Sequence, residues 1–140
     1  MNKIEFLTSI TKPDRSFKRL NKISPLRYPG GKTKAIGLIT QYLPDKMPKK
    51  ILSPFMGGAS LEIAWANTFD DVEEVVACDI FHPLTNFWNH ILSDPNKLAD
   101  ELEKFELGDD NYRAYKQILK DWYEDPINNK LTDLESAAHF

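Results

Sequence analysis

With 140 residues, 41% of them hydrophobic and 28% charged, the chain has the size and composition of one globular domain. This excludes a disordered acidic tail, a collagen-like rod and, since Cys78 is the single cysteine, a disulfide scaffold; no apolar run has the length of a membrane span, and no signal peptide is evident, so we expect a cytoplasmic protein. The net charge of −3 is unevenly distributed, because residues 1–50 hold 12 Lys and Arg with 3 Asp and Glu, whereas residues 51–140 hold 6 and 18.

Residues 1–22 are predicted to form a polar, basic arm that is partly disordered. Its cations indicate an anionic partner, although the same cations would also keep a chain end soluble.

Helical and strand patterns alternate along the rest of the chain. They predict a loop at 25–32, a helix at 33–43, a strand at 49–55, a helix at 59–67, a second strand at 74–79, and helices at 83–92, 95–105, 110–124 and from 132 onward. The second strand is expected to be buried, with Cys78 as a small core residue rather than a nucleophile. An aromatic stripe on the helix at 110–124 is expected to face the core or a partner.

The order of strand, glycine-rich turn, helix and a second strand ending in an acid predicts a βαβ unit, so the fold class is α/β. Only two or three strands are visible, whereas parallel sheets are normally buried on both faces. We therefore expect a sheet that is incomplete within this chain.

The turn after the first strand, at 53–60, has the features of a nucleotide-type site. In such βαβ units glycines let a ligand approach the backbone, and the following helix presents free N–H groups. Asp79 follows Gly58 by 21 residues, which is the spacing at which an acid binds ribose hydroxyls. An ordinary glycine turn and a capping aspartate would give the same pattern.

A second glycine turn precedes the helix at 33–43, in the segment Leu26-Arg27-Tyr28-Pro29-Gly30-Gly31-Lys32. It is not a P-loop, because no glycine stands at the required spacing upstream and prolines interrupt any strand. Lys32 on this turn has two interpretations: it forms a compact cationic site at the start of the helix, or it is an ordinary solvent-exposed residue of the turn.

Together, these clusters resemble the Dam-like DNA adenine methyltransferases, which transfer a methyl group from S-adenosylmethionine to the 6-amino group of adenine. Residues 25–32 resemble the family's N-terminal cofactor motif, 53–60 its glycine-rich loop, and 78–88 its acid-bearing strand end with the following helix. The resemblance implies a partial Rossmann-like methyltransferase fold. Its parts would be the arm at 1–22, a cofactor-binding part at 23–106, and a helical segment at 107–140 that leads toward DNA-recognition and catalytic regions.

The resemblance also implies the residues of an S-adenosylmethionine site, with Lys32 near the methionine carboxylate, Asp79 on the ribose hydroxyls and Ile80 on the adenine ring. Position 53 is Ser where many members carry an acid, so a contact to the cofactor's ammonium must come from elsewhere. Position 59 is Ala where many members carry Gly, a mild change if its backbone angle is helical. The full set is Tyr28, Pro29, Gly30, Gly31, Lys32, Phe55, Met56, Gly57, Gly58, Ala59, Ser60, Asp79 and Ile80.

The family's catalytic motif, Asp-Pro-Pro-Tyr, is absent from the sequence. Asp94-Pro95 and Asp125-Pro126 lack the second proline and the aromatic residue, and we interpret them as helix-start or loop signals. The resemblance therefore implies the N-terminal half of a bacterial or phage-type enzyme, with no catalytic residue and no metal of its own, and inactive alone. One candidate partner is accordingly a separate chain that carries the C-terminal half of the enzyme.

Double-stranded DNA is the implied partner of the complete enzyme. The basic residues expected to contact its phosphates are Lys12, Arg15, Lys18, Arg19 and Lys22. Two alternatives stay open: a non-catalytic binding or regulatory protein that keeps the cofactor domain, and a P-loop-like nucleotide binder.

Overall fold

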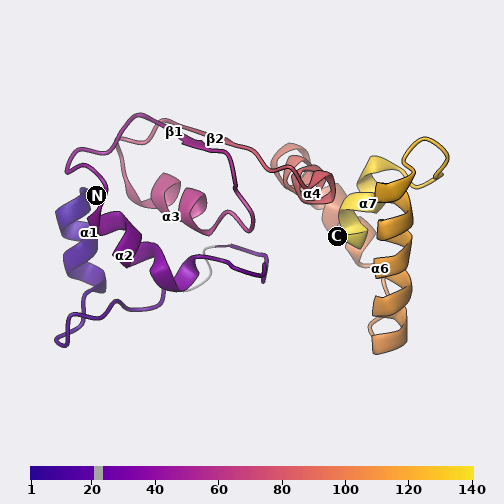
Figure 1. Cartoon of the computed structure of the whole chain (residues 1–140), viewed down its shortest axis with the longest axis horizontal. Coiled ribbons are helices and arrows are strands. Elements are labelled where there is room, and N and C mark those ends of the chain that lie inside the picture. Colours follow the sequence, from indigo (N-terminus) through magenta and orange to yellow (C-terminus); the bar gives the residue numbers. More distant parts are fainter. Residues whose placement is uncertain (21–23) are drawn as a thin grey trace. The chain divides into compact units, whose positions relative to one another are not determined.

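A computed structural model describes residues 1–20 and 24–140, which form two compact units, Met1–Cys78 and Asp79–Phe140 (Figure 1). The first unit contains α1 (Lys3–Ile10), the 3₁₀ helix η1 (Thr33–Ala35), α2 (Ile36–Gln41), β1 (Lys50–Ser53), α3 (Ser60–Thr68) and β2 (Glu74–Ala77). The second unit contains α4 (His82–Ser93), α5 (Pro95–Leu102), α6 (Asp109–Glu124) and α7 (Asp133–His139). The helices and strands predicted after residue 24 are confirmed, with boundaries that differ by at most three residues.

The two strands of the first unit pair in parallel and are connected through α3, so the predicted βαβ unit is confirmed. Their register places Lys50 opposite Glu74, and these two side chains form an ion pair at 3.0 Å. Lys49 and Glu73, one residue earlier on each side, form a second ion pair. Opposite charges at the start of both strands therefore support this register.

The expectation of a buried second strand is wrong. Val75, Val76 and Ala77 are only half-buried, Cys78 is exposed, and Leu52 on β1 is 69% exposed. A two-stranded parallel sheet needs cover on both faces, and α3, the helix that packs on β2, can cover only one of them. The sheet is accordingly small and incompletely covered within the described residues.

The expectation of a partly disordered arm is wrong for residues 3–10, which form α1. Asn2 caps this helix in a capping box with Glu5, and Phe6 and Ile10, four residues apart, are buried together on one face. The chain then turns back through an antiparallel bridge between Thr11 and Phe17. The N-terminal segment therefore contributes to the core of the first unit instead of extending from it.

The core of the first unit lies between α1, α2 and α3. Its buried members are Phe6, Ile10, Ile36, Met47, Ala64, Trp65 and Phe69. The indole N–H of Trp65 donates to the hydroxyl of Thr40 at 3.0 Å, which joins α3 to α2 inside this core. Gly37 lets Phe17 approach α2, because a methyl group on Gly37 would lie 2.5 Å from the Phe17 ring.

The second unit is helical, and α7 packs against α4, α5 and α6. The amide of Asn86 on α4 donates to the backbone carbonyl of Asp133 and to the hydroxyl of Ser136 on α7, both at 2.7 Å. Trp122 is buried on α6 and stacks on His82 with ring centroids 5.1 Å apart. Trp65, Trp88 and Trp122 are all buried, as expected of packing residues.

The division into two units falls at Cys78, away from the boundaries at residues 22 and 106 that the sequence suggested. The functional meaning of those three segments stays a prediction. Within the described residues, no helix combines the length and the apolarity that crossing a bilayer would require.

Candidate functional site

The first glycine turn of the candidate site runs from Tyr28 to Gly31. The N–H of Gly31 donates to the carbonyl of Tyr28 at 3.0 Å, and Gly30, at the third position, has a φ of +76°. Proline at the second position and a left-handed glycine at the third are the requirements of a type II turn. The sequence Tyr-Pro-Gly-Gly therefore fixes a rigid corner directly before η1 and α2.

The second glycine turn connects β1 to α3. The N–H of Ala59 donates to the carbonyl of Met56 at 2.9 Å, and Gly57 has a φ of +52°. The N–H of Met56 donates to the carbonyl of Cys78 at 2.9 Å, which holds the start of this turn against the end of β2. The turn thus lies at the carboxyl ends of the two parallel strands, where α/β sheets bind ligands.

Alanine at position 59 was expected to be a mild change if its backbone were helical, and this condition is not met. Its φ of 52° and ψ of 29° are left-handed, not helical, and it is the N-cap residue of α3. This conformation costs an L-alanine roughly 1–2 kcal/mol, a cost that glycine does not incur. Ala59 is therefore strained at the start of the helix that follows the turn.

The two glycine turns lie against each other. A methyl group added to Gly58 would lie 2.8 Å from Cβ of Tyr28, and one added to Gly57 would lie 3.4 Å from its ring. The hydroxyls of Thr33 and Ser60 are 3.1 Å apart and form a hydrogen bond between the helices that follow the two turns. Segments far apart along the sequence are thereby brought together.

A polar cavity of about 690 Å³ lies at the first glycine turn and is lined by residues between Arg19 and Lys34 together with Ser60 at the start of α3. Its side chains include the three cations Arg19, Arg27 and Lys34 together with the hydroxyls of Thr33 and Ser60. The volume lies in the range of small-molecule sites, and cations beside hydroxyls suit a ligand with a carboxylate or phosphate. Five of the predicted cofactor residues line this cavity: Tyr28, Pro29, Gly30, Gly31 and Ser60.

Other predicted cofactor residues do not line this cavity. The ammonium of Lys32 donates to the carbonyl of Gly30 at 2.6 Å and so is bonded to its own turn. Phe55 is 85% exposed and Ile80 is 93% exposed, so neither packs in a core. The carboxylate of Asp79 accepts from the N–H of Phe81 at 3.0 Å, close to the start of α4. The roles predicted for these four side chains stay predictions.

Comparison with known proteins gives a family match that covers most of the chain. Residues 28–137 match the family of D12 class N6 adenine-specific DNA methyltransferases. The chain belongs to this family. The match begins at Tyr28 of the first glycine turn and ends in α7, and it confirms the resemblance to Dam-like adenine methyltransferases. No curated protein sequence matches the chain significantly.

Sequence reasoning missed several polar residues that surround the glycine turns of this methyltransferase chain. Arg27 and Lys34 line the polar cavity, and Thr33 bonds to Ser60. Glu62 is buried in the first turn of α3 and accepts a hydrogen bond from the hydroxyl of Ser53 at the end of β1. Thr33 directly follows the first motif and Glu62 lies two residues after the second, and these positions were the available signal.

The structure describes four of the five basic residues that were predicted to contact DNA. Lys12, Arg15, Lys18 and Arg19 are exposed, and in the described part of the chain none of them forms an ion pair with a carboxylate. Arg19 also lines the polar cavity. Lys22, the fifth predicted contact, lies outside the described residues.

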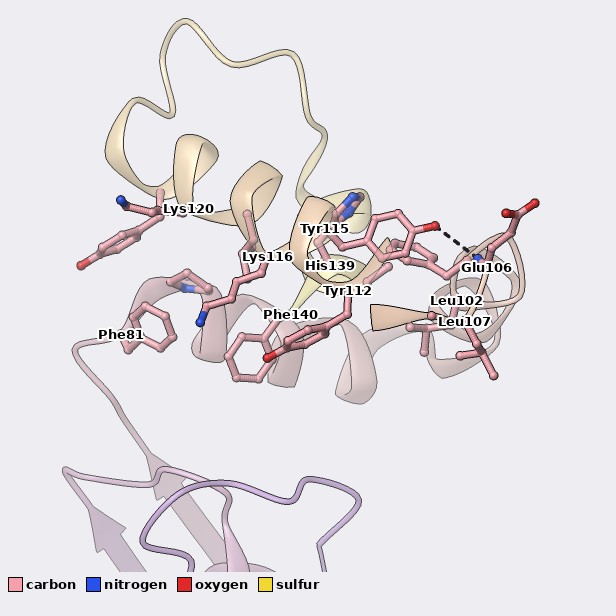
Figure 2. Close-up of a pocket in the computed structure, with 16 residues that line it drawn as sticks. Phe81, Leu102, Glu106, Leu107, Tyr112, Tyr115, Lys116, Lys120, His139 and Phe140 are labelled. Carbon is pink, nitrogen blue, oxygen red and sulfur yellow. Dashed lines mark hydrogen bonds between the residues drawn. The ribbon is translucent and has the colours of Figure 1, made fainter. Parts of the chain in front are cut away.

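A second cavity, of about 670 Å³, lies within the helical unit, and it is mainly apolar (Figure 2). Phe81, Tyr112, Tyr115 and Phe140 contribute aromatic rings, and Lys116 extends toward the same space. The hydroxyl of Tyr115 accepts from the N–H of Glu106 at 3.2 Å, and its ring packs on Phe105 at 4.5 Å. Three residues of the stripe on α6 that was expected to face the core or a partner, Tyr112, Tyr115 and Leu119, therefore line this cavity, whereas Trp122 is buried.

The two Asp-Pro dipeptides have local structural roles. Asp94 caps α5 by accepting from the N–H of Lys97 at 3.2 Å, and this bond lowers the pKa of its carboxyl. Asp125 ends α6, and its carboxylate accepts from the amide of Asn128 at 2.9 Å. Both are helix-boundary residues, as interpreted from the sequence.

Proposed function

We propose that the chain is the cofactor-binding part of an adenine-specific DNA methyltransferase, with β1, the glycine turn, α3 and β2 forming the start of a Rossmann-like sheet. The family match supports the methyltransferase activity. The cofactor site is supported by the contact of Tyr28 with Gly57 and Gly58, which joins the two glycine turns. When bound, S-adenosylmethionine supplies a methyl group on a sulfonium centre, which is transferred to the amine of adenine.

The residues of the first unit fit such a cofactor by their chemistry. Arg19, Arg27 and Lys34 offer positive charge to its carboxylate, and the hydroxyls of Thr33 and Ser60 offer hydrogen bonds. The glycine turn removes side chains where the backbone meets the ligand. In this proposal Asp79, which follows β2, accepts from the ribose hydroxyls, and the exposed side chains of Phe55 and Ile80 supply apolar cover.

The chemistry of base methylation requires more than this chain contains. The sequence has no Asp-Pro-Pro-Tyr, the motif whose polar groups hold the adenine amine and whose ring stacks on an extruded base. We therefore propose that a further polypeptide segment supplies it, that the cytoplasm is the place of action, and that DNA is bound in part by the cations of residues 12–19.

Calorimetric titration of the 140-residue chain with S-adenosylmethionine tests the cofactor site. Saturable binding is expected, and Gly58→Ala should weaken it about tenfold or more, because the added methyl would displace Tyr28 from the turn. Gly108→Ala is the matched control: it strains a residue with a φ of +149° in the other unit and should leave binding unchanged.

The absence of binding to the wild-type chain, in the presence of DNA as well, would favour a non-catalytic protein that keeps only the fold. Incubation of the isolated chain with DNA and radiolabelled S-adenosylmethionine is expected to transfer no methyl group. Turnover in that assay would contradict the need for a further segment.

A further inference from the structure

Glu62 is the most deeply buried carboxylate that the proposed site does not yet use. Its side chain belongs to the first turn of α3, and the residue is only 9% exposed. It accepts a hydrogen bond from the hydroxyl of Ser53, the last residue of β1. Among the residues that the structure describes, no Lys, Arg or His forms an ion pair with it.

Such an environment is unusual for a carboxylate. Buried charges in proteins are nearly always paired with an opposite charge, because a neutral partner compensates little of the lost hydration. A hydroxyl is the only hydrogen-bond partner of the Glu62 carboxylate in the described part of the chain. Since no buried side-chain oxygen in the described residues lacks a partner, the second carboxylate oxygen of Glu62 reaches solvent, and there a cationic group of a ligand would provide an opposite charge.

The position of Glu62 is also that of a ligand-binding residue. Ser53 ends β1, and ligands of parallel α/β sheets bind beyond the carboxyl ends of the strands. Ser53 and Glu62 stand on either side of the glycine turn, and Ser60, two residues before Glu62, lines the polar cavity. Glu62 itself does not line that cavity; its hydrogen bond to Ser53 places the carboxylate at the start of the glycine turn, at the carboxyl end of β1.

We propose that Glu62, oriented by the Ser53 hydroxyl, binds the α-ammonium group of the cofactor's amino-acid end. This inference rests on the proposed function, and it deepens it by assigning a residue to the positive group of the ligand. The arginines and lysine of the cavity complement the ligand's carboxylate, so the two charges of the amino-acid end meet opposite charges in one unit. Ser53 contributes a hydroxyl, not a charge, and the negative charge comes from α3.

A cycle of two proteins and two ligands tests this assignment. The wild-type chain and Glu62→Gln are titrated calorimetrically with S-adenosylhomocysteine and with its deaminated analogue, in which hydrogen replaces the ammonium. Glutamine keeps the length and a hydrogen-bond acceptor for Ser53 but removes the charge. Glu62→Gln should bind S-adenosylhomocysteine about tenfold or more weakly and should bind the deaminated analogue as the wild type does.

Glu73→Gln is the control variant, because Glu73 is exposed and forms a surface ion pair with Lys49; it should bind both ligands like the wild type. Equal weakening of both ligands by Glu62→Gln would show that Glu62 only holds the turn, and no weakening of either would exclude a contact; both results overturn the inference. If Glu62→Gln does not fold, equal affinity of the wild type for the two ligands overturns it as well. Failure of the wild type to bind either ligand would instead reject the proposed function, and the inference with it.

Discussion

Ala59 and Gly58 show how single residues set the geometry of the turn before α3. Gly58 has no room for a side chain beside Tyr28, whereas Ala59 carries a methyl group in a left-handed conformation. The side chain of Tyr28 therefore requires glycine at position 58. At position 59 the turn requires a left-handed backbone, although the residue there is alanine. The strain at Ala59 is local and can be removed by one substitution.

Replacing Ala59 with Gly should raise the free energy of unfolding by about 0.5–1 kcal/mol. Glycine relieves the left-handed strain and is a better N-cap than alanine. These two gains in folding free energy exceed the cost of glycine's larger conformational entropy in the unfolded chain. Urea unfolding measures this change. The same substitution at Ala66, an exposed position inside α3, should lower the free energy by about 1 kcal/mol. A decrease of similar size at both positions would contradict the left-handed conformation of Ala59.

At the scale of elements, helix ends are defined by side chains close in sequence. The hydroxyl of Thr132 accepts from the N–H of Glu135, and the carboxylate of Glu135 accepts from the N–H of Thr132 at 2.8 Å, which caps α7. The hydrogen bonds from the backbone and then the hydroxyl of Thr132 hold the pKa of Glu135 below its usual value of 4.5. Because α7 packs against α4, α5 and α6, this cap affects the whole helical unit.

The cap of α7 should weaken in acid. The pKa of Glu135 is lower in the folded chain than in the unfolded one, so its stabilisation is complete above about pH 4.5 and disappears as the pH falls through the lower folded value. Thermal unfolding followed by circular dichroism should show a difference between wild type and Glu135→Gln that is present at about pH 6 and shrinks toward about pH 3. Glu103→Gln, an exposed change in the same unit, should leave the pH profile unchanged. A difference that grows on acidification would contradict the cap.

At the scale of the whole chain, charge is separated along the sequence. Residues 1–50 carry a net charge of +9 and residues 51–140 a net charge of −12. Several cations of the helical unit, such as Lys97 and Lys120, form ion pairs with nearby carboxylates, whereas those of residues 12–19 form none in the described part of the chain. The unpaired cations are the better candidates for binding DNA phosphates.

Removing these charges should reduce the salt dependence of DNA binding. Deleting the whole N-terminal segment would also remove core residues of α1, so substitution is the better test. Four changes to Gln, at Lys12, Arg15, Lys18 and Arg19, should reduce the slope of log K against log salt by about 0.9 for each DNA phosphate that the variant no longer neutralises. Four changes to Gln at Lys97, Lys104, Arg113 and Lys120 alter the net charge equally and should reduce the slope less. Equal slopes for the two variants would discard this binding surface.

The order of helices and strands after residue 24, the βαβ unit, the two glycine turns and the family could all be predicted from the sequence. These features depend on local signals, such as the proline and glycines of Tyr28–Gly31 and the apolar spacing within the helices. The N-terminal helix was missed although its capping box and the helical spacing of Phe6, Leu7 and Ile10 stand in the sequence. A helix of eight residues is marginal by itself, and the burial of Phe6 and Ile10 in the core stabilises it.

Which residues meet at the candidate site, and how deeply each is buried, could be learned only from the folded chain. The contact of Tyr28 with Gly58, the bond between Thr33 and Ser60, and the pairing of Ser53 with Glu62 depend on how the chain folds back on itself. The same holds for the exposure of Cys78, since a strand's burial depends on the elements that cover it. Long-range packing sets contacts and burial, and no local pattern of residues encodes either one.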